Sequence, residues 1–273
     1  MEVAQIDLFD THCHLDADAF DNARDQWVTK ANQAGLNYML VPSIGTTKNW
    51  TKVTALKKRY GTLTALGLHP LYTQHFDHTD LVELEAWISR EKPVAIGEIG
   101  LDNWPGSPDF AQQEKFFVAQ LKLAKQYHLP VILHVRRAID QALKQLRTIS
   151  VLGGIVHAFS GSMQQAHQLM DLNFKLGFGS SITYDRAHRI RHLAKALPDE
   201  AIVLETDAPD RLPAWTKQTP AALQAIQQYA AILASLRGQS LENVAACTTQ
   251  NAFEALCMTP STSSRLHVPL QTI

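Results

Sequence analysis

The sequence has 273 residues, with 25 Lys and Arg side chains against 26 Asp and Glu, for a formal net charge of -1 at pH 7. Hydrophobic residues make up 45% of the chain and charged residues 19%, which is typical of a globular protein with a large buried core. This composition excludes a disordered chain, a collagen-like repeat and a coiled coil. The near-zero charge also excludes a protein that holds nucleic acid through its overall charge, so any contact with a polyanion must be local.

Cysteine usage indicates the compartment. The three cysteines, Cys13, Cys247 and Cys257, are too few and too scattered for a disulfide framework, so we expect a reducing, cytoplasmic location. The first residues lack the basic segment and the long apolar core of a signal peptide. No apolar run reaches membrane-spanning length, so we expect no membrane association, and no feature of the sequence indicates an obligate protein partner.

Eight short apolar runs recur along the chain, each bounded by Gly, Pro or polar residues. The most apolar of them are rich in Val and Ile, which is typical of parallel strands covered on both faces. The runs are Ile6–Phe9, Tyr38–Ile44, Leu63–Leu68, Val94–Ile99, Val131–Val135, Gly154–Phe159, Lys175–Gly179 and Ile202–Thr206.

Stretches with helical spacing of apolar residues lie between or after these runs. Phe110–Tyr127, Arg136–Arg147 and Met163–Leu172 are examples, and Ala221–Arg237 and Leu241–Leu256 are expected to form two terminal helices. Eight strands in 273 residues give about 34 residues per strand-helix unit, close to what a (β/α)8 TIM barrel requires.

The predicted fold class is therefore α/β, with residues 1–258 forming a single (β/α)8 barrel and residues 259–273 a loose C-terminal tail. A doubly wound open sheet is the competing architecture. The position of the polar residues favours the barrel, because most of them follow the strands at their C-terminal ends. In a closed barrel these ends meet at one open end, here called the mouth, where active sites of this fold lie.

Side chains of metal-binding type end five of the predicted strands. Because side chains alternate along a strand, His12 and His14 face the same way and can chelate one divalent ion, whereas Cys13 faces away. The candidate metal ligands are four imidazoles and two carboxylates, namely His12, His14, Glu98, His134, His157 and Asp207.

Six ligands are too many for one tetrahedral ion that also holds water. They suit two divalent ions about 3.5–4 Å apart, joined by a bridging carboxylate, for which Glu98 is the candidate. Zinc, magnesium, manganese and iron all fit these ligand types.

Each residue taken singly has a structural alternative. A lone His at a strand end is more often a hydrogen-bonded structural residue, Glu98 could pair with Arg136, and Asp207 could begin a turn. Independent structural uses would not place all six residues at the same end of five strands, so the joint pattern favours a metal centre.

The same residues lie in motifs that resemble those of the TatD-family metal-dependent deoxyribonucleases, nearest to the YjjV-like branch. The resemblance extends from Asp10 to about Leu256, nearly the whole chain. The motifs are DTHCHLD at Asp10–Asp16, GLHP at Gly67–Pro70, GEIGLD at Gly97–Asp102, PVILHVRR at Pro130–Arg137, HAFSGS at His157–Ser162, SITY at Ser181–Tyr184, ETDAPD at Glu205–Asp210 and TTQNAFEAL at Thr248–Leu256.

The resemblance implies an amidohydrolase-like barrel, two divalent ions on the six ligands and hydrolysis of phosphodiester bonds in DNA. For that reaction Asp207 and Glu205 are the candidate catalytic residues. Asp207 serves as the general base and Glu205 holds a neighbouring ligand in place. His69, Arg136 and Ser160 are the candidates for substrate binding, because they can donate hydrogen bonds to phosphate oxygens.

Other functions stay open at this point. A binuclear centre also serves hydrolases of small phosphoesters, amides or lactones. A non-catalytic binding protein is disfavoured because no ligand is missing. DNA would be bound locally, as by an exonuclease that grips one end, and without sequence specificity. The segment Asp185–His192 is either a phosphate-binding patch or a solvated helix face, and Trp104 either lines the mouth or anchors a loop.

Overall fold

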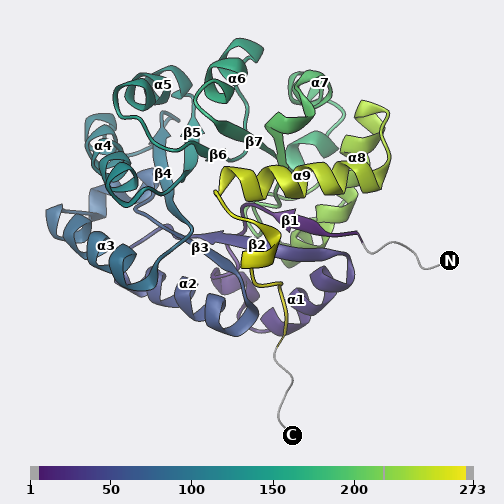
Figure 1. Cartoon of the computed structure of the whole chain (residues 1–273), viewed down its shortest axis with the longest axis horizontal. Helices are drawn as coiled ribbons and strands as arrows, with labels where there is room; N and C mark the ends of the chain where they lie inside the picture. The colour runs from purple at the N-terminus through teal and green to yellow at the C-terminus, as the bar shows by residue number, and fades with distance from the viewer. Residues whose placement is uncertain (1–5, 218, 269–273) are drawn as a thin grey trace, which may run out of the picture.

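The computed structural model describes residues 6–217 and 219–268, and its centre is a barrel of eight parallel strands (Figure 1). Neighbouring strands are hydrogen-bonded in chain order from β1 to β8, as a succession of strand-helix units produces. The predicted TIM barrel is therefore confirmed, and the open sheet is excluded. The strands are β1 (Leu8–Asp10), β2 (Leu36–Pro42), β3 (Leu63–Leu66), β4 (Ala95–Asp102), β5 (Val131–Arg136), β6 (Gly154–Val156), β7 (Phe174–Phe178) and β8 (Ile202–Leu204).

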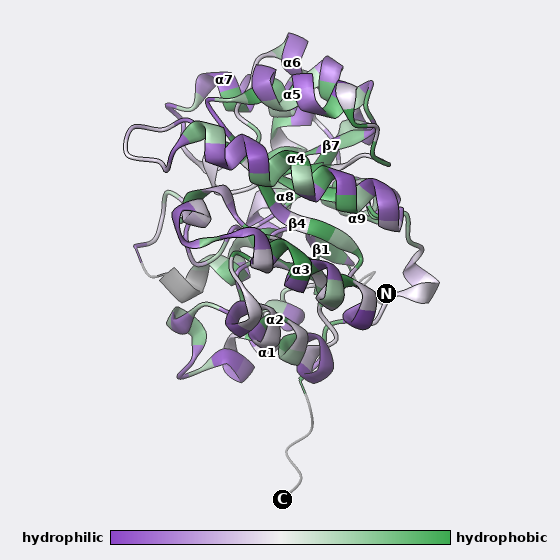
Figure 2. Ribbon diagram, turned by 90° about the vertical axis from the view of Figure 1, so that its left-hand side faces the viewer, coloured by the Kyte–Doolittle hydropathy of each residue, from purple (hydrophilic) through white to green (hydrophobic). Residues whose placement is uncertain are grey.

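Helices surround the strands in an outer ring (Figure 1). Figure 2 shows apolar residues concentrated on the strands and hydrophilic residues on the outward helix faces, the pattern that a barrel covered on its outside requires. The helices are α1 (Arg24–Gln33), α2 (Thr47–Tyr60), α3 (His78–Glu91), α4 (Phe110–Tyr127), α5 (Ile139–Thr148), α6 (Met163–Met170), α7 (His188–Ala196), α8 (Ile226–Arg237) and α9 (Leu241–Ala255).

Two helices begin later than their apolar spacing predicts. The expected helix at Arg136–Arg147 starts only at Ile139, because Arg136 is the last residue of β5 and Arg137 has a left-handed φ of 53°. The first part of the expected helix at Ala221–Arg237 belongs to a 3-10 segment, Thr219–Ala225, that leads into α8.

The barrel is closed at the end where its strands begin. Phe253 of α9 packs its ring 5.2 Å from that of Phe9 and 4.9 Å from that of Tyr38, measured between centroids. Asn251 of α9 donates hydrogen bonds to the backbone carbonyls of Asp199 and Ile202, at 2.7 and 2.8 Å. Because α9 covers this end, the opposite end, where the strands finish, forms the mouth.

The seam between β8 and β1 is closed by bonds just beyond the two strands. The Thr11 amide donates to the Leu204 carbonyl at 3.0 Å, and the Asp207 amide donates to the His12 carbonyl at 2.8 Å. The buried carboxylate of Asp10 accepts from the amide of Thr206 at 2.9 Å and from its hydroxyl at 2.5 Å. These contacts hold the segments that carry His12 and Asp207 side by side.

The segment after α9, expected to be a loose tail, is exposed over most of residues 259–265 but is anchored to the barrel near its described end, at Leu266 and Val268. Its Leu266 is 3% exposed and donates its amide to the Asn37 carbonyl at 2.7 Å, while Arg265 pairs with Asp7 at 2.7 Å. The remainder of the predicted tail, residues 269–273, lies outside the described residues. Over residues 6–217 and 219–268, no helix combines the length and the apolar character that crossing a membrane requires.

Candidate metal centre

The six predicted metal ligands meet at the mouth. His12 and His14 follow β1, Glu98 lies within β4, His134 lies within β5, and the remaining two follow β6 and β8. His12 and Glu98 are at most 1% exposed. Residues far apart in the sequence are thus placed in one buried polar cluster. Its members are His12, His14, Glu98, His134, His157 and Asp207.

Glu98 lies at the centre of this cluster, and its two oxygen atoms face different imidazoles. Its Oε2 lies 3.1 Å from His12 Nε2 and 3.6 Å from His14 Nε2. Its Oε1 lies 2.9 Å from His157 Nε2 and 3.1 Å from His134 Nδ1. A carboxylate that bridges two cations requires this division between its oxygens. The alternative pairing of Glu98 with Arg136 is not present.

Asp207 completes the side of the cluster that carries His12 and His14. Its Oδ1 lies 3.7 Å from His14 Nε2 and 3.9 Å from His12 Nε2. The ligand atoms of these three residues lie within 4.8 Å of one another, as do those of His12, Glu98 and His157. Both sets therefore have the dimensions of a divalent-cation site.

The nitrogen atoms of the cluster converge in a way that fits cations. His12 Nε2 lies 3.3 Å from His14 Nε2, and His134 Nδ1 lies 3.2 Å from His157 Nε2. In each pair one ring nitrogen can donate a hydrogen bond to the other, and loss of that proton would leave two lone pairs that face the same space. Glu98 Oε2 is buried and has no hydrogen-bond partner among the described residues. Imidazole and carboxylate donors of this kind fit divalent metal ions.

Burial and neighbouring groups set the protonation of Glu98 and His157 within the cluster. Burial opposes ionisation of Glu98, but the neighbouring His12, His157 and His69 outweigh it and hold the pKa of Glu98 well below its usual range. Burial, reinforced by the nearby His12, lowers the pKa of His157 to about 4. Glu98 is therefore an anion and His157 a neutral imidazole at neutral pH, the two forms that bind a metal.

Asp102, at the end of β4, was not predicted as a site residue, and it orients His134. Its Oδ2 lies 2.8 Å from His134 Nε2, which leaves the Nδ1 atom of that ring directed at Glu98. Burial opposes protonation of His134, but the hydrogen bonds to Asp102 and Glu98 raise its pKa to about 9. A carboxylate behind a ligating His fixes its ring and raises its basicity. Asp102 is the last residue of the GEIGLD motif, and this motif is the sequence feature that could have indicated its role.

His69 points into the cluster as a hydrogen-bond donor. Its Nδ1 accepts the Leu71 amide at 3.1 Å, so in the neutral ring the proton is on Nε2. That Nε2 lies 3.3 Å from Glu98 Oε1. Burial lowers the pKa of His69, which favours the neutral ring. The ligand atoms of His69, Glu98 and His134 also lie within 4.8 Å of one another, but in the neutral ring the Nε2 proton makes His69 a donor toward Glu98, and its contact to substrate stays a prediction.

Glu205, predicted as a catalytic residue, lies behind His157. Its Oε1 accepts the Ala158 amide at 2.7 Å and lies 3.9 Å from His157 Nδ1. Burial raises the pKa of Glu205 well above its usual range. A Cβ atom at Gly177 would lie 2.1 Å from Glu205 Oε2, so only glycine leaves room for this side chain. This position fits the predicted support of a neighbouring ligand.

A cavity of about 700 Å³ extends from this cluster over the β5, β6 and β7 side of the mouth. It brings two of the predicted substrate contacts, Arg136 and Ser160, together with Asp207. Of the segment Asp185–His192, two residues line the cavity, and one of them is Arg189. The other lining residues include two arginines that the sequence analysis did not single out, together with the indole whose role it left open, namely Arg137, Arg211 and Trp104.

Arg211 contacts the candidate base directly. Its Nε lies 3.2 Å from Asp207 Oδ2, while Asp207 Oδ1 faces the imidazoles. The guanidinium is about half exposed, with 47% of its side chain accessible. Arg211 follows the ETDAPD motif immediately, but the short loop that carries it lacks a pattern of its own, so its role depends on three-dimensional position.

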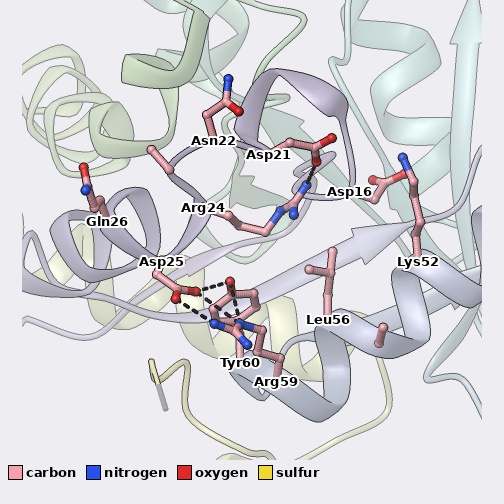
Figure 3. A pocket seen from close by; sticks show the side chains of 12 residues that line it. Asp16, Asp21, Asn22, Arg24, Asp25, Gln26, Lys52, Leu56, Arg59 and Tyr60 are labelled. Atoms are coloured by element: carbon pink, nitrogen blue, oxygen red, sulfur yellow. Dashed lines mark hydrogen bonds and ion pairs between the residues drawn. The ribbon is translucent and has the colours of Figure 1, made fainter. Parts of the chain in front are cut away.

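A second hollow, of about 580 Å³, lies between α1 and α2 and is also lined by charged residues (Figure 3). Its charges pair with one another: Arg24 contacts Asp21 at 2.6 Å, and Asp25 contacts Arg59 at 2.6 Å as well as the Tyr60 hydroxyl. Lys52 pairs with Asp18 at 2.8 Å, so among the charged residues that line this hollow only Asp16, which accepts a hydrogen bond from Asn49, has no ion pair with a described residue. The cluster at the mouth, where four imidazoles and two carboxylates of metal-binding type converge, is the stronger candidate for a functional site.

Comparison with known proteins identifies the family of this chain. The profile of the family described as TatD related DNase matches residues 9–256. The Escherichia coli protein named uncharacterized metal-dependent hydrolase YjjV is 38% identical over 251 residues, covering 90% of this chain and 96% of that protein. A Klebsiella pneumoniae protein named 3′-5′ ssDNA/RNA exonuclease TatD is 30% identical over 251 residues, covering 89% and 95%.

Comparison with solved structures identifies the same family. The crystal structure of Escherichia coli YjjV superimposes with a TM-score of 0.88 and 36% sequence identity, covering 92% of this chain and 98% of that one. Sequence profile and structure thus agree over nearly the whole barrel. The chain belongs to the TatD-related DNase family of metal-dependent hydrolases.

Proposed function

We propose that this protein is a deoxyribonuclease that hydrolyses phosphodiester bonds at a strand end, with two divalent cations at the mouth. The observation that best supports this proposal is the position of Glu98 between two sets of imidazoles, beside a cavity lined by arginines. The name of the Klebsiella pneumoniae relative, a 3′-5′ ssDNA/RNA exonuclease, supports the same reaction class.

The six clustered ligands would hold the cations, with Glu98 shared between them. Divalent cations at that position supply charge neutralisation for a phosphate and lower the pKa of nearby water. Four imidazoles among six ligands favour zinc or iron over magnesium and manganese, which prefer ligands with oxygen atoms. The ligands are His12, His14, Glu98, His134, His157 and Asp207.

The side chains around the ligands have distinct tasks in hydrolysis. Asp207 is the proposed base: its Oδ2 takes a proton from the water whose oxygen attacks phosphorus. The bond from phosphorus to the leaving nucleoside oxygen breaks, and that oxygen takes up the proton that Asp207 accepted, which forms a hydroxyl and regenerates the base. His69 and Arg136, with Ser160, donate hydrogen bonds to phosphate oxygens as their negative charge grows. Glu205 holds His157 in place from behind.

The cavity favours a phosphate-bearing substrate over a neutral amide or lactone. A binuclear centre alone would also serve a small phosphoester, an amide or a lactone. Arginines line this cavity, however, and guanidinium groups recognise phosphate rather than neutral amides or lactones. The local arginines also fit binding of DNA without sequence specificity by a chain whose net charge is near zero.

A reconstituted nuclease assay tests the proposal. Protein stripped with a chelator and reloaded with zinc, manganese or magnesium is incubated with single-stranded oligonucleotides labelled at the 5′ or the 3′ end. We expect stepwise shortening from one end with at least one metal, and loss of turnover in Asp207→Asn with an unchanged circular dichroism spectrum. Faster turnover of lactones or of bis(p-nitrophenyl) phosphate than of DNA would favour the small-molecule alternative.

A further inference from the structure

We propose that Arg137, held by Trp104 beside Arg136, forms a second phosphate-binding subsite next to the reacting bond. The inference rests on the proposed function and sharpens it, since the preferred substrate then carries a second phosphate group beside the one that is cut. A single isolated diester would occupy only the reacting position. The substrate class is therefore an oligonucleotide or a nucleotide with a terminal phosphate.

The two guanidinium groups meet on one indole. The Cζ atoms of Arg136 and Arg137 lie 3.8 and 4.1 Å from the centre of the Trp104 ring. Contacts of this kind between a guanidinium and an aromatic ring are favourable and orient both groups. Arg137 reaches the indole because its left-handed φ of 53° turns the chain at the end of β5. Two cations are thereby placed side by side at the edge of the cavity.

These two guanidinium groups are free to bind an anion. Among the described residues, neither forms an ion pair or a side-chain hydrogen bond. The other arginines of the cavity are engaged: Arg189 donates to the Gly161 carbonyl at 2.9 Å, and Arg211 pairs with Asp207. Adjacent like charges repel, and a phosphate, which accepts two hydrogen bonds from one guanidinium, neutralises them.

The acidic groups of the cavity do not neutralise them either. Asp140, which lines the same cavity, accepts a hydrogen bond from Gln165 Nε2 at 2.9 Å. Glu205 accepts the Ala158 amide, and Asp207 pairs with Arg211. Each carboxylate of the cavity therefore has another partner, and the charge of the pair of arginines remains available.

The subsite is tied to the metal centre through Asp102. Its Oδ1 accepts the Trp104 amide at 2.8 Å and the Ser107 hydroxyl at 2.7 Å, while its Oδ2 contacts the ring of His134. The Asn103 amide also donates to the Arg136 carbonyl at 2.9 Å. One carboxylate thus positions both a metal ligand and the indole, so the second phosphate would be bound at a fixed distance from the reacting one.

Three dinucleotides that differ by a single phosphate test this subsite. They are dTpdT, pdTpdT with a 5′-phosphate and dTpdTp with a 3′-phosphate, and kcat/KM is measured for each with the metal-loaded protein. We expect one of the phosphorylated forms to exceed dTpdT about tenfold, mainly through KM, as one charge-assisted contact produces. The favoured end also reports the direction of digestion.

Variants of Arg137 and Trp104 test whether these residues cause the gain in kcat/KM that the second phosphate gives. Arg137→Gln and Trp104→Ala should lower the ratio between the favoured dinucleotide and dTpdT to near one, and Trp104→Phe should retain part of it. The matched control is Arg90→Gln on α3, whose guanidinium lies 4.1 Å from the centre of the Trp87 ring outside the mouth. This control should keep the full ratio. Equal kcat/KM for all three dinucleotides in the wild type, or an unchanged ratio in Arg137→Gln, would overturn the proposal.

A binding measurement separates failure of the subsite from failure of the proposed function. Fluorescein-labelled (dT)4 is titrated with protein in the presence of a chelator, and fluorescence anisotropy reports its binding. Weaker binding by Arg137→Gln than by Arg90→Gln, by about threefold or more, supports the subsite even if no phosphodiester is cleaved. Equal binding by these two variants counts against the subsite, whatever the nuclease assay shows.

Discussion

The two ends of the barrel are both buried, but they satisfy their polar groups differently. At the closed end, Asn251 is 3% exposed and donates to two backbone carbonyls, and Thr249 donates its hydroxyl to the Asp7 carbonyl at 3.0 Å. At the mouth, the ionisable side chains of His12 and Glu98 are equally buried and retain atoms without a hydrogen-bond partner among the described residues, whereas the atoms without a partner near the start of β3 are the neutral hydroxyls of Thr62 and Thr64. Unpartnered buried polar groups destabilise a fold, so the closed end supports stability whereas the mouth is arranged for binding.

The backbone shows the same division. Left-handed residues elsewhere end helices, as Lys92 ends α3 and His128 ends α4, a position where this conformation satisfies helix carbonyls. At the mouth, Asp207, Ala158 and Arg137 have φ values of 52°, 46° and 53° without such a role. Each of them directs a side chain or an amide into the candidate site, which is where strained backbone is usually retained.

Glu98→Gln should have the largest effect, and it should separate the two ends. Removing the charge that both sets of imidazoles share should lower turnover by about 10³-fold or more, since metal-ion catalysis supplies several kcal/mol. The number of tightly bound metal ions per chain, measured by elemental analysis, should also fall. The midpoint of thermal unfolding of the metal-free protein should change little.

The matched control for this variant is Glu83→Gln, which removes a carboxylate from the outer surface of α3 and should leave turnover unchanged. If Glu98→Gln bound as much metal as the wild type, Glu98 would not be a shared ligand, and the contrast between the ends would lose its functional meaning.

Phe253→Ala should give the opposite result at the closed end. The Phe253 ring is fully buried against Phe9 and Tyr38, so its truncation should lower the free energy of unfolding by about 3–5 kcal/mol. Metal content and kcat of the folded fraction should stay close to those of the wild type. Denaturant titration measures the first quantity and active-site titration with metal the second. Phe253→Leu, which retains most of the volume, should lose less than half as much stability.

Local patterns predicted most of the fold and the ligand set. The eight strands are recognisable as short apolar runs, and the candidate ligands follow them directly, so knowledge of the fold class is enough to bring His12, Glu98 and Asp207 to one end. The alternation of side chains along a strand explains only in part why His12 and His14 face the same cluster. β1 ends at Asp10, and bonds to the β8 side, such as that from the His14 amide to the Ala208 carbonyl at 2.8 Å, position the two rings.

Features that depend on partners distant in the sequence could not be predicted in this way. Asp102 orients His134 because β4 and β5 are paired with Asp102 opposite Arg136, a register that the sequence does not show. Leu266 is held by the carbonyl of Asn37, more than two hundred positions earlier in the printed sequence. The polar composition around Leu266 therefore predicted a loose tail, whereas the structure anchors this segment to the barrel at Leu266.

Asp102→Asn should have an intermediate effect. It tests whether Asp102 connects the metal centre, through His134, to the Trp104 side of the cavity. An amide holds the His134 ring less firmly and makes it less basic, so metal affinity should fall about 10–100-fold. Competition with a chromophoric chelator measures that affinity. Ser107→Ala is the control, because it removes another contact of Asp102, at 2.7 Å, without touching His134. Equal losses in both variants would indicate a general loosening of the loop rather than orientation of the ring.

Asp199→Asn at the closed end should have the smallest effect, and its pH dependence has a definite sign. Hydrogen bonds from Gln239 and Arg237 hold the pKa of Asp199 below its usual value of 3.8. A carboxyl whose pKa is lowered by folding contributes stability above the pKa of the unfolded chain and loses it as the pH falls through the folded pKa. The group is 44% exposed, so the contribution should stay below about 1 kcal/mol.

Urea titrations at pH 7 and near pH 3 measure this contribution. The variant should be slightly less stable than the wild type at pH 7, and this difference should become smaller at the lower pH, whereas the exposed Asp171→Asn should match the wild type at both. A difference that persists or grows on acidification would show that the charge of Asp199 does not stabilise the closed end. The stability of that end would then depend on apolar packing and on uncharged hydrogen bonds such as those of Asn251.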